Sequence, residues 1–136
     1  MSEKITGGCL CGQIRYEMMS QPRLQLACHC ADCRKQSGSA FTASAMVLRD
    51  DIEITGQTKT YLDTGDSGNQ IKRVFCPNCG SSLFSEVAAR PDSLALSAGS
   101  IDDPGWFKPR VNLWTESALS WVAIDPDCKN FPKNAG

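Results

Sequence analysis

The chain contains Cys76-Pro77-Asn78-Cys79-Gly80, in which two cysteines flank a gap of two residues. This spacing is typical of a zinc knuckle, because the gap forms a tight turn and the glycine accepts a left-handed backbone conformation. Backbone amides of such a turn can point at the sulfur atoms. Thioredoxin-like redox pairs have the same spacing, but they need a βαβ context that this sequence lacks. The stretch therefore predicts half of a metal site.

A second pair, Cys9-Leu10-Cys11, can supply the other half. Residues i and i+2 of an extended segment face the same side, so both sulfurs can reach one ion. Together with Cys76 and Cys79 they make a closed set of four sulfur ligands. Soft sulfur ligands in a tetrahedral arrangement favour zinc or an iron–sulfur cluster. We expect a structural zinc here.

The third cluster, Cys28-His29-Cys30-Ala31-Asp32-Cys33, supplies only three thiolates from one segment. A fourth position is therefore left open, which is the difference between a catalytic zinc and one that only holds the fold together. Cys128 is the remaining conceivable ligand. Because Pro126 and the C-terminal tail surround it, we expect Cys128 to be a spectator thiol.

The residues beside this cluster have two interpretations each. His29 is either a proton donor or an ordinary hydrogen-bonded histidine, and it is not expected to bind the same zinc. Arg34 and Lys35 either offset the charge of the cluster and hold a substrate carboxylate, or are solvated side chains. His29, Arg34 and Lys35 are therefore the candidate substrate-binding residues.

Charge determines what a three-thiolate zinc can activate. Three thiolates on a dication leave a net charge of −1, so such a zinc is a weaker Lewis acid than one held by neutral histidines and should activate water poorly. A free thiol with a pKa near 8.5 is only about 3% ionised at pH 7, whereas coordination would deprotonate it. A small thiol is therefore the expected ligand.

The composition of the 136 residues is that of one ordinary domain. Fourteen basic and fifteen acidic residues give a net charge of −1, which predicts neither nucleic-acid nor membrane partners. The N-terminus lacks a signal-peptide pattern, and no run of about 18 apolar residues occurs, so we expect a cytoplasmic protein. In that reducing compartment paired cysteines favour metal over disulfides. We expect a single domain over 1–136, with a core at about 5–125 and a loosely ordered tail at 129–136.

Frequent Gly, Pro, Ser and Asp residues favour a mainly β fold with short strands. Alternating or β-branched stretches predict strands at 13–18, 40–47, 52–54, 58–62, 71–75 and 121–124. A helix is expected only over Ala31 to Gln36, with Gly38 ending that turn.

Taken together, the cysteine motifs resemble those of the glutathione-dependent formaldehyde-activating enzyme family. The resemblance is carried by Gly7-Gly8-Cys9-Leu10-Cys11-Gly12, Cys28-His29-Cys30-Ala31-Asp32-Cys33-Arg34 with Ser37-Gly38-Ser39, Phe75-Cys76-Pro77-Asn78-Cys79-Gly80-Ser81, Ala98-Gly99-Ser100-Ile101-Asp102-Asp103-Pro104 and Glu116-Ser117-Ala118-Leu119-Ser120-Trp121. It implies an Mss4-like fold of short antiparallel strands stapled by two zinc ions. It also implies a structural zinc on Cys9, Cys11, Cys76 and Cys79 and a catalytic one on Cys28, Cys30 and Cys33.

The resemblance implies a zinc-dependent carbon–sulfur lyase like S-(hydroxymethyl)glutathione synthase, which adds glutathione to formaldehyde. Its partners would be a small thiol and an aldehyde. Two alternatives stay open: an enzyme acting on another thiol or small electrophile, and a non-catalytic zinc-binding module that mediates partner binding.

Overall fold

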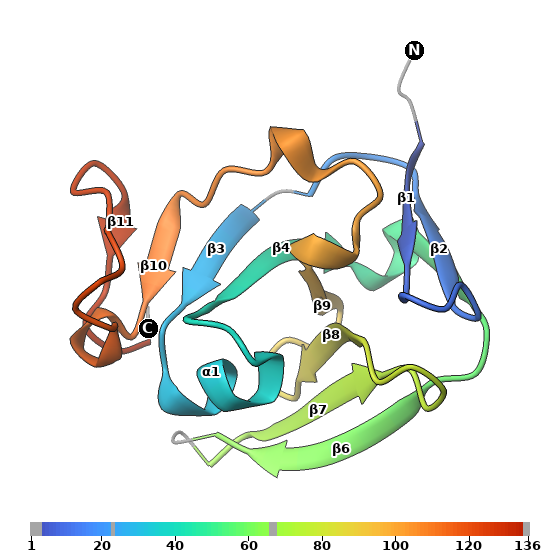
Figure 1. Ribbon diagram of the computed structural model, residues 1–136, viewed down its shortest axis with the longest axis horizontal. Coiled ribbons are helices and arrows are strands. Elements are labelled where there is room, and N and C mark those ends of the chain that lie inside the picture. The colour runs from blue at the N-terminus through green and yellow to red at the C-terminus, as the bar shows by residue number, and fades with distance from the viewer. Residues whose placement is uncertain (1–3, 23, 66–67, 135–136) are drawn as a thin grey trace.

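The computed structural model describes residues 4–22, 24–65 and 68–134, which form two β-sheets (Figure 1). The smaller sheet has the order β1-β2-β5 and consists of β1 (Ile5–Gly8), β2 (Arg15–Met18) and β5 (Ile52–Thr55). The larger has the order β11-β10-β3-β4-β9-β8-β7-β6 and consists of β3 (Leu24–Cys28), β4 (Thr42–Leu48), β6 (Lys59–Thr64), β7 (Gln70–Phe75), β8 (Ser82–Val87), β9 (Ser93–Ser97), β10 (Val111–Leu113) and β11 (Lys129–Asn130).

Helical structure is short. The α-helix α1 spans Ala31–Ser37, and 3₁₀ turns span Arg49–Asp51, Ala98–Ser100, Pro104–Trp106 and Thr115–Ser117. Gly38 ends α1 in the left-handed conformation, with φ of 65°, as the sequence predicts. Among the described residues no helix has the length and apolar character needed to cross a membrane.

The prediction of a mainly β fold with little helix is confirmed. Strands β3, β4, β9, β8, β7 and β6 pair antiparallel, whereas β10 is parallel to both β3 and β11. The small sheet and β11 lie at opposite ends of the molecule (Figure 1). Between these ends, α1 connects β3 to β4 and carries part of one cysteine cluster.

The core lies where the small sheet packs on the middle of the large one. In β2, Tyr16 and Met18 are buried while their neighbours along the strand are exposed, so this strand turns one face inward. That face packs in one cluster with fully buried side chains of the large sheet, such as Leu83 and Leu96. This burial of apolar surface is the main stabilising contribution available to the fold.

The expected strand at 121–124 is wrong. This segment forms turns and coil, and the Val122 amide donates to the Leu119 carbonyl 3.0 Å away instead of to a neighbouring strand. Trp121 is 74% exposed, so its apolar side chain does not contribute to the core. The apolar run belongs to a surface loop.

The described part of the C-terminal tail adds to the edge of the large sheet. Lys129 and Asn130 form β11 against β10, and the amides of Trp114 and Thr115 donate to the carbonyls of Lys133 and Phe131. These backbone hydrogen bonds hold residues 129–133 to the sheet edge. Residues 135–136 lie outside the described part.

The close approach of β1 and β2 gives a prediction at Gly7. A methyl group added there would overlap the Tyr16 hydroxyl and the Ser100 carbonyl oxygen. Tyr16 is buried and hydrogen-bonded to the Ser100 hydroxyl at 2.6 Å, so neither neighbour can move cheaply. Gly7→Ala should lower the free energy of unfolding by about 1–3 kcal/mol, measured by urea denaturation.

Gly99→Ala is the matched control. No heavy atom lies within 4 Å of the methyl group it would add, so its stability should stay within about 0.5 kcal/mol of the wild type. Equal losses in the two variants would contradict the overlap at Gly7.

Candidate functional site

The turns that follow β1 and β7 bring four cysteines together. Cys11 and Cys76, one from each turn, are 65 positions apart in the chain. The Sγ atoms of Cys9, Cys11, Cys76 and Cys79 all lie within 4.8 Å of one another. The Cys9–Cys11 and Cys11–Cys76 sulfur pairs are 3.5 and 3.8 Å apart. The pairing of these two motifs that the sequence predicts is therefore present in the fold.

Backbone amides surround these sulfur atoms. The amides of Asn78 and Cys79 each lie 3.4 Å from the Cys76 sulfur, and the Ile14 amide lies 3.3 Å from that of Cys9. The Ser81 hydroxyl and neighbouring backbone groups lower the pKa of Cys79 to about 5. Such donors stabilise thiolates, which is the form that binds metal.

The second cluster is built where β3 runs into α1. Cys28 ends β3, Cys30 is the N-cap of α1, and Cys33 lies in its first turn. Their Sγ atoms again lie within 4.8 Å of one another, and all three residues are half-buried. Within 4–22, 24–65 and 68–134, no further cysteine, histidine or carboxylate joins them.

Hydrogen bonds make the three cysteines unequal. The Cys30 sulfur accepts a bond from the Cys33 amide at 3.2 Å. Hydrogen bonds from the Cys28 and Cys33 side chains, together with this amide, hold the pKa of Cys30 far below its usual value, whereas hydrogen bonds with Cys30 and Cys33, together with burial, raise the pKa of Cys28. The three sulfur atoms therefore form one interacting group.

His29 lies inside the protein. It is 1% exposed, its Nε2 lies 3.0 Å from Asn112 Oδ1, and its amide donates to the Leu113 carbonyl. Its ring packs beside Phe41 at a centroid distance of 5.2 Å. His29 therefore anchors the segment that carries Cys28 and Cys30 to β10, and its side chain presents no surface to a substrate.

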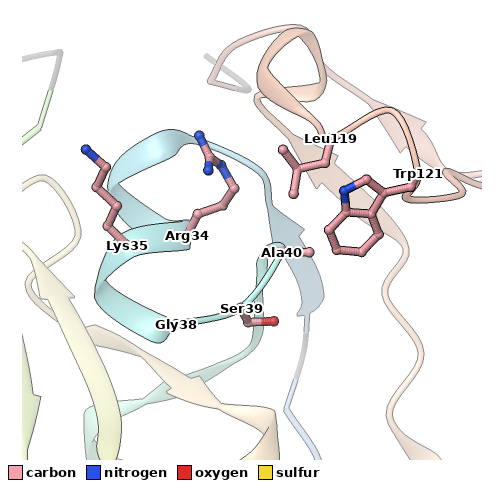
Figure 2. Close-up of a pocket in the computed structure, with 7 residues that line it drawn as sticks. All are labelled: Arg34, Lys35, Gly38, Ser39, Ala40, Leu119 and Trp121. Carbon is pink, nitrogen blue, oxygen red and sulfur yellow. The ribbon is translucent and has the colours of Figure 1, made fainter.

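Arg34 and Lys35 line a pocket of about 340 Å³ on one side of α1 (Figure 2). Leu119 and Trp121 form the opposite side; the Arg34 side chain extends toward Leu119, while Lys35 points away from Trp121. The Nε atom of Arg34 is buried and has no hydrogen-bond partner among the described residues. The loop at 119–121, which ends at the first residue of the strand expected at 121–124, is thus a wall of this pocket.

Cys128 lies apart from both clusters. Its thiol donates to the Pro109 carbonyl at 3.3 Å, and it is absent from the two groups of converging sulfur atoms. This position agrees with a spectator thiol.

The sequence analysis missed Arg73, which is 5% exposed on β7. Its Nε donates to Asp63 Oδ2 at 2.9 Å, and the Arg73 guanidinium keeps the pKa of Asp63 below its usual value. A signal was present in the sequence, because in an extended strand Arg73 shares one face with the apolar Ile71 and Phe75, whereas Lys72 lies on the other face. A cation at an inward position of a strand is unusual enough to indicate a partner.

Both donor sets suit zinc. They consist only of sulfur atoms, and ligands about 2.3 Å from a tetrahedral ion lie about 3.8 Å from each other, close to the sulfur separations seen here. Four sulfurs complete a tetrahedral shell, whereas three leave one position for another ligand. The chain thus contains two groups of cysteines that can each hold a metal ion.

The chain is similar to proteins of several organisms. An uncharacterised lyase of Schizosaccharomyces pombe is 25% identical over 126 residues, which cover 92% of this chain and 83% of the relative. A Penicillium rubens protein that bears the name of a glutathione-dependent formaldehyde-activating enzyme is 27% identical over 119 residues, covering 85% of this chain and 62% of that protein.

A crystal structure of a Rhodobacter sphaeroides protein matches with a TM-score of 0.55 and 18% identity, covering 77% of this chain and 92% of that one, which shows a common fold. The family model described as glutathione-dependent formaldehyde-activating enzyme matches residues 4–117. Because this match spans well over half of the sequence, the chain belongs to the glutathione-dependent formaldehyde-activating enzyme family.

Proposed function

We propose that this protein is a zinc-dependent carbon–sulfur lyase that joins a thiol such as glutathione to formaldehyde or another small electrophile. The observation that carries the proposal is the contrast between the clusters. Four cysteines form a complete ligand set, whereas Cys28, Cys30 and Cys33 form an incomplete one, and the helix that carries Cys33 also lines a pocket with the cations Arg34 and Lys35. An incomplete sulfur set is expected where a substrate supplies the last ligand.

The residues around the cluster have distinct proposed roles. Cys28, Cys30 and Cys33 would hold the zinc, which would supply the charge that keeps a substrate thiol deprotonated. Arg34 and Lys35 bind carboxylate groups of the thiol from the pocket that they line. His29, buried against Asn112, holds the segment that carries Cys28 and Cys30 in place.

The proposed reaction is an addition that balances without an oxidant or reductant. The thiolate sulfur donates an electron pair to the carbonyl carbon, which forms the carbon–sulfur bond. The π pair of the carbonyl moves to oxygen, which takes a proton from water. The product is a hydroxymethyl thioether, and the reverse reaction is the lyase direction.

Exchange measured at equilibrium tests this function, because the uncatalysed addition is already fast. With wild-type protein, the rate of exchange between formaldehyde, glutathione and S-hydroxymethylglutathione should be higher than in a protein-free control. Cys30→Ser should return it to the control, whereas Cys128→Ser, a cysteine outside both clusters, should leave it unchanged. Equal exchange in wild type and Cys30→Ser would refute the synthase activity and favour a non-catalytic module.

A second arm tests the pocket. Because 2-mercaptoethanol has no carboxylate, replacing both Arg34 and Lys35 by glutamine should weaken glutathione binding by about tenfold and leave 2-mercaptoethanol unaffected. Calorimetric titration of both thiols decides this. Equal losses for the two thiols would show that the cations support the fold or the metal and not the carboxylates.

A further inference from the structure

Arg73 is a buried cation placed between two anionic groups. Its side chain is 6% exposed, and it pairs through Nε with the Asp63 carboxylate, whose side chain is 25% exposed. The register of β6 and β7 sets Arg73 opposite Tyr61, so Asp63 reaches it diagonally along the neighbouring strand. The carboxylate thus approaches from the more exposed side and fixes the plane of the guanidinium.

The packing of α1 on the large sheet brings Arg73 to the three-cysteine cluster. Gln36, one helical turn beyond Cys33, donates to the Ser82 hydroxyl at 3.1 Å, and Ser82 pairs with Phe75, which lies on the same face of β7 as Arg73. Burial opposes the charged form, yet the Asp63 carboxylate and the nearby Cys33 sulfur hold the pKa of Arg73 above its usual value. The charge of Arg73 also acts on Cys30. A guanidinium has five N–H donors in a planar fork, so it can satisfy Asp63 through Nε and still direct other donors at sulfur.

We propose that Arg73, oriented by Asp63, is the fixed countercharge of the Cys28, Cys30 and Cys33 cluster and makes its open position favour anionic ligands over neutral ones. This inference rests on the proposed role of the cluster in binding a thiol. It adds a specificity-determining residue that lies outside the cysteine motifs.

The physical reason is the charge balance. Three thiolates and a dication have a net charge of −1, and an anionic fourth ligand makes the net charge −2 in a poorly solvated environment. A buried guanidinium offsets part of that charge for a thiolate but contributes little to a neutral ligand. Lys72, exposed on the opposite side of the same strand, is too well solvated to do the same.

Ligand titration of the cobalt-substituted protein tests the inference without measuring activity. At one fixed pH of 8, thiocyanate is an anionic probe that carries no proton and imidazole is a largely neutral one, and both change the visible spectrum of bound cobalt. Arg73→Gln should weaken thiocyanate binding by about tenfold or more, which is the order expected for removing one weakly solvated charge, and leave imidazole binding nearly unchanged.

Three variants complete the experiment. Lys72→Gln is the matched control and should behave like the wild type, and Arg73→Lys should recover part of the thiocyanate affinity because it restores the charge without the fork. If Arg73→Gln fails to fold, Asp63→Asn decides, because it keeps the cation and removes the carboxylate that neutralises part of its charge. It should raise the thiocyanate-to-imidazole affinity ratio.

An unchanged ratio in folded Arg73→Gln, or in Asp63→Asn where the former does not fold, overturns the inference. Failure of the proposed function looks different. A wild-type protein that shows the Arg73-dependent preference for thiocyanate but no thiol exchange would refute the lyase and retain the countercharge. Thiol exchange together with an unchanged thiocyanate-to-imidazole affinity ratio would refute the countercharge and retain the lyase.

Discussion

Cys76→Ser is expected to abolish folding of the domain. Cys76 is fully buried at the end of β7, and its sulfur lies 3.8 Å from that of Cys11 on the β1–β2 turn. A structural zinc contributes about 10–16 kcal/mol of apparent binding free energy in zinc-finger peptides, which matches or exceeds the whole stability of a typical domain. Losing one of four ligands therefore removes more stability than the core can replace.

Cys33→Ser should be much milder. Its three ligands come from one local segment, so the metal there closes only a short loop, and the variant should fold while binding one zinc ion where the wild type binds two. Circular dichroism melts and elemental analysis of both variants give the comparison, with Cys128→Ser as the control. Equal destabilisation of Cys76→Ser and Cys33→Ser would remove the distinction between a structural and an open site.

The cysteine clusters were predictable because they depend on local spacing. A two-residue gap followed by Gly80 defines its own turn, and Gly80 indeed has a positive φ of 80°. The same holds for the end of α1, where Gly38 is a local signal. Pairing the 9–11 turn with the 76–79 turn needed only the count of ligands that one metal takes.

What the sequence could not show depends on distant contacts. Strands β3, β8 and β9, which the sequence did not predict, are five or six residues long and lie inside the large sheet, where each pairs with a neighbour on both edges. The stretch at Trp121 has strand-like composition but forms turns and coil. Propensity does not decide such cases, because packing against neighbours does.

The candidate site was predicted in its ligands and not in its surroundings. His29 has the same sequence neighbours whether it faces solvent or Asn112. Its orientation depends on contact with β10, which lies more than eighty positions further along the chain. Alternation along β7 could indicate that Arg73 is buried, but only the folded chain places it close enough to interact with Cys30 and Cys33. Charges that act through space are therefore the part of a metal site that spacing alone does not reveal.

Glutathione is expected to bind the open cluster about a hundredfold more tightly than S-methylglutathione, because only a free thiol can become an anionic ligand. The methyl compound keeps both carboxylates, so contacts with Arg34 and Lys35 cancel in the comparison. Binding of the thiol should release one proton below the free thiol pKa near 8.5, so the affinity should rise about tenfold per pH unit from 6 to 8 and level off above. Calorimetry in buffers of different ionisation enthalpy counts that proton. Similar affinities for the two ligands, or binding without proton release, would show that the sulfur does not occupy the open position.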